Sequence, residues 1–271
     1  MNYSIFESTM ADMNYQEIEA AAKNQAIILF PVAVIEEHGP HLCLGADVYL
    51  TYIVCKKVKE ALAKEGLEAL IAPPFYWGIN KVTGAFAGSF TVRRSTMKAM
   101  LGDLLLCLKN WGFNRIYLFN FHGDYEHNIT IFESVRDSRI DLGVRAYVAL
   151  DEFDLKRYGL KGDEEHIVTY QTPRPEGPRP EYMDVHAGSF ETSLMTFNFP
   201  ELVNQEVART LESSKTTWED GRIWTRGWDD ARKVTPLGYC GDPANIDLEM
   251  ATEIDESTVD GITKMFIKMY K

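Results

Sequence analysis

Short apolar runs alternate along the chain with longer segments whose apolar residues recur at helical spacing. Residues 27–35, IILFPVAVI, are rich in β-branched side chains and predict a strand buried on both faces. Comparable runs at 67–75, 115–121 and 144–150 predict three further strands. Helices are predicted over residues 14–24, 48–64, 94–110 and 127–140, with a final amphipathic helix near the end of the sequence.

This order of strands and helices predicts a fold of the α/β class. Strands that alternate with helices favour a mainly parallel sheet covered on both faces, which is a three-layer α/β/α sandwich. A length of 271 residues fits a single domain spanning 1–271. In such sheets, binding sites gather beyond the carboxyl ends of the strands.

The regular pattern stops between about residues 152 and 185, where the sequence becomes charged and rich in proline, including QTPRPEGPRPEYMD. Long irregular loops are uncommon in compact domains and are more often lids, oligomer contacts or partly disordered segments. We interpret 152–185 as an insertion and favour a lid or a contact surface over disorder.

Composition excludes several classes of protein. The net charge of -12, from 28 Lys and Arg against 40 Asp and Glu, argues against nucleic-acid binding. No apolar run approaches the roughly 20 residues of a membrane helix, and the first residues do not resemble a secretion signal. The four cysteines are scattered, without a CxxC pair, which is typical of reduced thiols. We therefore expect a cytoplasmic protein that does not bind membranes.

Polar residues follow the first predicted strand directly. Glu36 and His38 are separated by one residue, so an extended backbone projects both side chains to the same side. Asp47 lies just before the helix predicted at 48–64, where an Asp is either the N-cap or a ligand supplied from a helix start.

Two later segments offer the same kinds of side chain. HGDYEHN at 122–128 follows the third strand, and HAGSFETSLM begins at His186, where Ser189 or Thr192 is a candidate helix cap. Mixed imidazole and carboxylate ligands suit zinc, manganese or iron. A carboxylate shared between two ligand sets favours two ions about 3.5 Å apart and hydrolytic chemistry. The candidates in these two segments are His122, Asp124, Glu126, His127, His186 and Glu191.

These segments resemble a known family. IEEHGPHLCLGAD is similar to the creatininase signature, in which a strand ends in Glu-x-His-Gly-Pro-His and an Asp follows nine residues after the first His. NFHGDYEHN resembles the Asn-Gly-His segment of that family, HAGSFETSLM its His-Ala-Gly…Glu-Thr-Ser motif, and GYCGDP a late Gly-x-x-Gly-Asp-Pro turn. The four matches keep the family order between residues 27 and 245.

The resemblance implies a three-layer α/β/α fold, two divalent metal ions per chain and a homo-oligomer, frequently a hexamer. By motif position, Glu36 and His122 hold one ion, His38 and Asp124 hold the other, and Asp47 bridges them. Zinc or manganese is expected, and iron is compatible with the ligands.

The third motif supplies the expected catalytic residues. The resemblance makes His186 the proton shuttle or the residue that orients the substrate. Glu191 acts with it, either behind the ligands or as an additional ligand.

Some positions depart from the family pattern and bear on the substrate. Asp124 has a shorter side chain than the Glu of creatininase, which leaves Glu126 as a rival ligand. INKVTGAF replaces the usual Ser-x-Glu-His, so its substrate contact is either missing or replaced by Asn80 or Lys81, with Tyr125 and Tyr182 as the aromatic candidates. We therefore expect a small-molecule substrate other than creatinine.

Three functions follow from this interpretation. The first is a metal-dependent hydrolase that cleaves the carbon–nitrogen bond of a small cyclic amide or a formamide. The second is hydrolytic carbon–carbon ring opening of an inositol-derived cyclic diketone, as in 3-dehydro-scyllo-inosose hydrolase. The third is a non-catalytic relative that binds a small molecule, because a fold does not fix a function.

Overall fold

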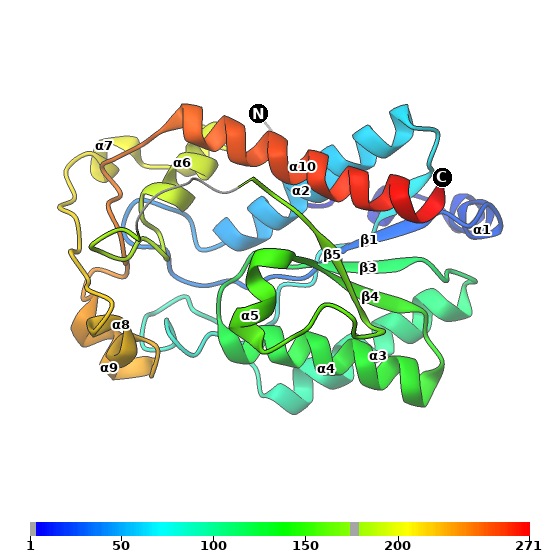
Figure 1. Cartoon of the computed structure of the whole chain (residues 1–271), viewed down its shortest axis with the longest axis horizontal. Coiled ribbons are helices and arrows are strands. Elements are labelled where there is room, and N and C mark those ends of the chain that lie inside the picture. Colours follow the sequence, from blue (N-terminus) through cyan, green and yellow to red (C-terminus); the bar gives the residue numbers. More distant parts are fainter. Residues whose placement is uncertain (1–3, 174–178) are drawn as a thin grey trace.

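A computed structural model describes residues 4–173 and 179–271, and its architecture is an all-parallel sheet between two layers of helices (Figure 1). The five strands are ordered β2-β1-β3-β4-β5, so the strand that precedes the Glu36 segment lies inside the sheet. The strands are β1 (Ile27–Pro31), β2 (Ala69–Ile71), β3 (Ile116–Phe119), β4 (Ala146–Asp151) and β5 (Ile167–Tyr170). The predicted α/β/α sandwich is confirmed.

Helices cover both faces of this sheet, with α2 and α10 on one face and α3 and α4 on the other (Figure 1). The α-helices are α1 (Tyr15–Lys23), α2 (Ala46–Lys64), α3 (Arg94–Asn110), α4 (Tyr125–Leu142), α5 (Leu155–Tyr158), α6 (Ser189–Asn198), α7 (Gln205–Ala208), α8 (Asp220–Trp224), α9 (Trp228–Val234) and α10 (Leu248–Tyr270). Short 3-10 helices are η1 (Met10–Asp12), η2 (Glu152–Asp154) and η3 (Pro200–Leu202).

Alternation along β1 explains why the sheet is buried on both sides. Ile28 and Phe30 pack into the cluster that contains α3 and α4, whereas Ile27 and Leu29 pack into the cluster of α2 and α10. Successive side chains of a strand point to opposite faces, so one apolar run supplies both cores. A third cluster joins α6 to the start of α2.

The predicted strands are longer than the observed ones. The run 27–35 pairs with its neighbours only as far as Pro31, apart from an isolated bridge between Val32 and Phe75. The residues beyond Pro31 leave the sheet, and this departure carries Glu36 and His38 past the carboxyl end of β1.

The stretch interpreted as an irregular insertion contains regular structure. Residues 167–170 form β5, which pairs in parallel with β4 at the edge of the sheet, so that part of the expectation was wrong. Residues 174–178, in the middle of the proline-rich sequence, lie outside the described residues.

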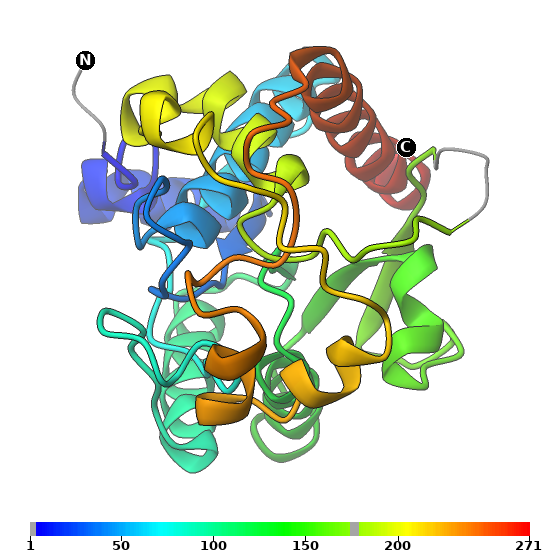
Figure 2. The same ribbon diagram turned by 90° about the vertical axis from the view of Figure 1, so that its left-hand side faces the viewer.

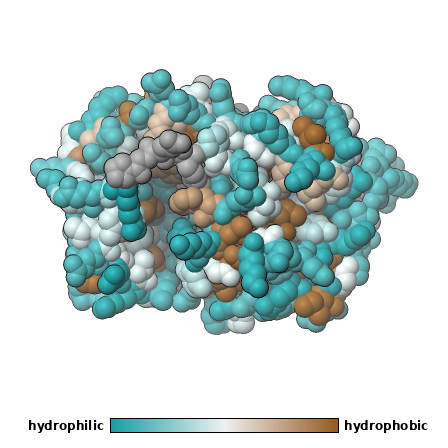
Figure 3. Space-filling model, in the orientation of Figure 1, coloured by the Kyte–Doolittle hydropathy of each residue, from teal (hydrophilic) through white to brown (hydrophobic). Residues whose placement is uncertain are grey.

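The short helices between residues 189 and 234 gather at one end of the molecule. Helices α6, α7, α8 and α9 lie at the left of Figure 1, and Figure 2 looks directly onto that end. The surface seen in Figure 3 is mostly hydrophilic, with apolar side chains in separate patches. Among the described helices, none has the length and apolar character that crossing a membrane requires.

Candidate metal centre

Glu36 and His38 are buried at the end of the extended segment after β1, with exposed fractions of 3% and 0%. The Nδ1 atom of His38 lies 3.1 Å from the carbonyl oxygen of Glu36. Its other ring nitrogen, Nε2, faces carboxylates, at 3.5 Å from Asp47 Oδ1 and 3.9 Å from Glu191 Oε2.

Asp47 lies in the first turn of α2 and is not its N-cap, which is Gly45. The prediction of an N-cap role was therefore wrong by two positions. Because the Asp47 carboxylate does not cap the helix, both of its oxygens are turned toward imidazoles, Oδ1 toward His38 and Oδ2 toward His122.

His122 comes from the loop between β3 and α4. It contacts Glu36 and Asp47 from the end of β3, the strand beside β1. Its Nδ1 lies 2.9 Å from Glu36 Oε1 and 3.1 Å from Asp47 Oδ2. Its Nε2 lies 3.1 Å from the carbonyl oxygen of Ile79. Neighbouring parallel strands, β1 and β3, thus deliver their polar ends to one place.

His186 and Glu191 enter from the segment around the start of α6. Nε2 of His186 lies 2.8 Å from the carbonyl oxygen of Glu37, while Nδ1 lies 3.9 Å from Glu36 Oε1 and 4.0 Å from Glu191 Oε2. The N-cap of α6 is Gly188, without a side-chain bond, so the predicted capping by Ser189 or Thr192 was wrong.

The three imidazoles share one arrangement. Each places one ring nitrogen on a backbone carbonyl, which can only accept a hydrogen bond, so that nitrogen must carry the proton. In the neutral ring the other nitrogen is then a lone pair, and in all three it points at carboxylates. Lone pairs facing carboxylates repel unless a cation or a proton lies between them. This is the arrangement in which metal-ligating histidines are held, so the residues present fit a divalent metal.

The pKa values of the clustered side chains show that the site favours positive charge. Burial alone would lower the pKa of His38, but the carboxylates of Asp47 and Glu191 outweigh it and raise the pKa to about 10. The pKa of His186 rises to about 9 against burial, mainly through Glu36. Burial would raise the pKa of Asp47, but the facing His38 and His122 hold that pKa well below its ordinary value.

Potential ligand atoms fall into three groups whose members lie within 4.8 Å of one another. Within the described residues, the groups are Glu36, Asp47 and His122; His38, Asp47 and Glu191; and Glu36, His38 and His186. Glu36, His38 and Asp47 each belong to two groups. Asp47 places one oxygen near His38 and the other near His122, which is the geometry of a carboxylate that can bridge two ions.

Comparison with known proteins identifies the family of this chain. A family model described as "Creatininase: Creatinine amidohydrolase" matches residues 11–266. The chain belongs to the creatininase family.

Among its relatives, creatinine amidohydrolase of Pseudomonas putida is 30% identical over 212 residues, covering 75% of each chain. The 3-dehydro-scyllo-inosose hydrolase of Thermotoga maritima is 25% identical over 235 residues, covering 84% of this chain and 68% of that one. A crystal structure of creatininase has the same fold, with a TM-score of 0.74, 23% identity and coverage of 97% and 98%. The chain is accordingly a creatininase-family amidohydrolase.

Asp124, which the creatininase motif assigned to the metal ligands, lies at the start of α4. Its Oδ1 accepts hydrogen bonds from the backbone N–H groups of Glu126 and His127, which makes it the N-cap of α4. Its Oδ2 accepts from the N–H of Lys81 at 2.9 Å. Both oxygens bond to backbone N–H groups and the residue joins none of the three groups, so a ligand role for Asp124 stays a prediction. Glu126, the rival, is half exposed and lies 3.3 Å from the Lys81 ammonium.

The side chain proposed to contact substrate at position 80 is buried. Nδ2 of Asn80 donates to the carbonyl oxygens of Ile35 and Phe90, and the residue is 0% exposed. Its amide nitrogen is thus used by backbone carbonyls, and contact between Asn80 and substrate stays a prediction. The Lys81 ammonium forms an ion pair with Glu126. Tyr125 is 55% exposed and stacks on Tyr158, and Tyr182 is 37% exposed.

Two neighbours of the cluster had no signal in the sequence. The hydroxyl of Thr83 donates to Glu36 Oε2, and the half-buried ring of Trp224 lies 6.4 Å from the ring of His186. Thr83 comes from an irregular segment and Trp224 from the end of the short helix α8, and the positions of both depend on tertiary packing. His41 is also buried, with Nε2 2.9 Å from the Thr192 hydroxyl oxygen.

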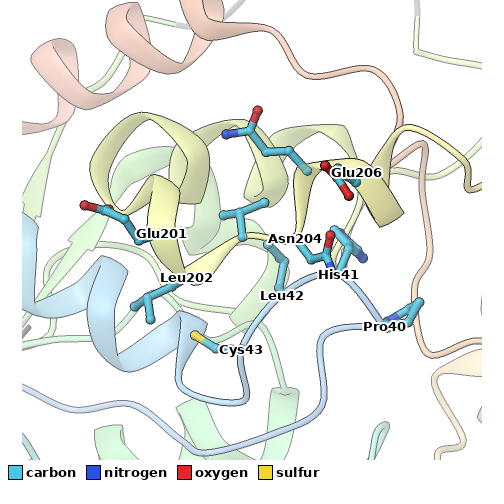
Figure 4. A pocket seen from close by; sticks show the side chains of 10 residues that line it. Pro40, His41, Leu42, Cys43, Glu201, Leu202, Asn204 and Glu206 are labelled. Atoms are coloured by element: carbon cyan, nitrogen blue, oxygen red, sulfur yellow. The ribbon is translucent and has the colours of Figure 1, made fainter.

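A cavity of about 660 Å³ lies beside the His41 segment (Figure 4). It is lined by residues 40–43 and 201–206, and the clustered ligands do not line it. It is therefore distinct from the candidate metal centre.

Proposed function

We propose that this creatininase-family hydrolase holds two divalent ions that share Asp47 and cleaves a carbon–nitrogen bond in a small cyclic amide or a formamide. The observation that supports it is the set of buried imidazoles that donate one N–H to a backbone carbonyl and turn the other nitrogen toward carboxylates. Zinc and manganese are the expected ions, since solved creatininases include Zn–Zn and manganese forms.

The two groups that contain Asp47 define the proposed ligands. Glu36, Asp47 and His122 would hold one ion, and His38, Asp47 and Glu191 would hold the other. Glu191 thereby replaces Asp124 in the set implied by the motifs. Its mostly buried carboxylate brings the count of acidic groups to three, a negative charge that two dications are suited to balance.

Bound ions of this type polarise a carbonyl group and lower the pKa of water. The chain's own contribution to the reaction is proton handling at His186. Its Nε2–H is held by the Glu37 carbonyl, so Nδ1 is the atom left to take a proton and return it. Glu37 Oε1, 3.4 Å from the same Nε2, stabilises the protonated ring.

Metal analysis tests the ligand assignment. We expect two ions per wild-type chain after purification with added zinc or manganese, because two groups share Asp47. Asp47→Ala should lose both, and Glu191→Gln should lose one while retaining the fold. A wild-type chain that takes up no ion, or full activity after complete removal of metal, would rule out the proposal.

The Thermotoga maritima relative favours a second candidate reaction, carbon–carbon ring opening of a cyclic diketone. Lys81 and Tyr182 remain partly exposed and could hold substrate hydroxyls, whereas Asn80 is buried. A panel of lactams, formamides and cyclic diketones separates the two reactions. Light scattering on the purified protein tests the predicted hexamer.

A further inference from the structure

Residues 79–83 cross between the two strand ends that carry the ligands. On one side, Asn80 Nδ2 donates to the Ile35 carbonyl oxygen at 3.1 Å and the Thr83 hydroxyl donates to Glu36 Oε2. On the other side, the Lys81 N–H donates to Asp124. This segment, which we call the brace, is therefore bonded both to the segment that follows β1 and to the N-cap of α4.

Ile79 links His127 to His122 through its own backbone. Its N–H donates to Nδ1 of His127 at 3.2 Å, and its carbonyl oxygen accepts from Nε2 of His122 at 3.1 Å. His127 is fully buried, and its ring stands nearly perpendicular to that of His122 with centroids 5.0 Å apart. The backbone of Ile79 is thus fixed on one side by His127 and orients His122 on the other.

Gly78 is required for this approach. A Cβ atom at position 78 would lie 2.4 Å from the His127 ring, closer than real Cβ contacts. The absence of a side chain there lets His127 reach the neighbouring N–H.

We propose that Thr83 and His127 are positioning residues for one ion only, the ion held by Glu36, Asp47 and His122. The inference rests on the proposed function, and it assigns residues that act behind the ligands. Thr83 bonds Oε2 of Glu36 and leaves Oε1, which faces His122 Nδ1, for the ion. His127 acts through Ile79 to fix the Nε2–H tautomer and the orientation of the His122 ring.

The ligands of the second ion are held by different bonds. His38 is oriented by the Glu36 carbonyl, and Glu191 accepts a hydrogen bond from the Ala187 N–H. Neither bond passes through the brace. Replacing Thr83 or His127 should therefore lower the affinity for one ion more than for the other. This difference distinguishes a positioning role from a general loss of stability.

Two matched pairs of variants test the proposal. Thr83→Val removes the hydroxyl at nearly constant shape, whereas Thr83→Ser keeps it. His127→Leu removes the acceptor, whereas His127→Asn places an amide oxygen where Nδ1 lies. Metal-free full-length protein would be titrated with zinc against a competing chelator, and the unfolding midpoint of each variant would be measured alongside.

We expect Thr83→Val and His127→Leu to lower the affinity for one of the two ions by about tenfold or more. This is the range found for residues that hydrogen-bond to metal ligands. The other ion should bind as in the wild type, and Thr83→Ser and His127→Asn should keep both. The proposal is overturned if all four variants bind both ions normally, or if both ions weaken together. A wild type that binds no ion would instead overturn the proposed function, and this inference with it.

Discussion

At the scale of single residues, Asp47 and Asp124 show how the same side chain takes two roles. Both follow a strand and precede a helix, and the sequence predicts a cap or a ligand at Asp47 and a ligand at Asp124. The start of each helix decides: Asp124 is the N-cap of α4 and bonds backbone N–H groups, whereas Asp47 lies two positions past the N-cap of α2 and faces imidazoles. That difference depends on where each helix begins, which the sequence pattern locates only within a few residues.

Asp124→Asn tests the N-cap role directly. We expect the variant to hold two ions at saturating metal, because Asp124 belongs to neither of the proposed ligand sets. Its free energy of unfolding should fall by about 1–2 kcal/mol, since one atom facing the N–H groups changes from acceptor to donor. Urea unfolding and metal analysis measure the two quantities. Loss of an ion at saturation would restore Asp124 to the ligand set.

Several elements could be predicted from the sequence because their patterns are strong. The helix predicted at 94–110 coincides with α3, and those at 14–24 and 48–64 differ from α1 and α2 by one or two residues at their ends. Strand β5 was missed because it is a four-residue edge strand with only two buried positions. Alternation cannot stand out over so short a run.

The candidate site was predicted in part, for a related reason. The segments after β1 and β3 belong to neighbouring strands, so a parallel sheet brings Glu36 and His122 together. The position of Glu191 depends on how α6 packs against α2 and α10, which no local pattern encodes. Thr83 carries no sequence signal at all, because the path of residues 76–92 is set by tertiary hydrogen bonds.

Two helical glycines give opposite predictions at the scale of elements. A Cβ atom added to Gly102 in α3 would have open space around it, since its nearest neighbour is the Ser138 hydroxyl oxygen at 3.9 Å. Gly102→Ala should therefore raise the free energy of unfolding by about 0.5–1 kcal/mol, the helical preference for Ala.

Gly261 in α10 is the matched case with no space. Its added Cβ would lie 2.3 Å from the backbone carbonyl oxygen of Gln171, just after β5. Gly261→Ala should lower the free energy of unfolding by about 1–3 kcal/mol, because overpacking outweighs helix preference. Denaturant unfolding of both variants checks the pair. Equal effects would mean that α10 can move away from β5 without cost.

At the scale of the whole molecule, the buried cluster predicts how stability depends on pH when metal is absent. The pKa values of His38 and His186 are raised to about 10 and about 9, above the ordinary value of 6.5. Groups with a raised pKa in the folded state contribute stability that is fully present below 6.5 and is lost as the pH rises through 9 and 10. The metal-free protein should thus become less stable from pH 6.5 upward.

Thermal unfolding from pH 6 to 10, with and without zinc, measures this effect. The metal-free midpoint should fall steadily across the range, while metal binding, which competes with those protons, should strengthen as the pH rises. An increase of the metal-free midpoint between pH 7 and 9 would contradict the charge arrangement described for the cluster.

The clustered side chains come from segments that are far apart along the chain, since His186 contacts the carbonyl of Glu37 across 149 residues. The complete ligand set can therefore exist only after the sheet has formed and α6 has packed against α2 and α10. Ions captured so late would leave the rate of folding almost unchanged and act on the reverse step, because they must leave before the chain opens. Bound metal would then set the lifetime of the folded protein more than the speed of its formation.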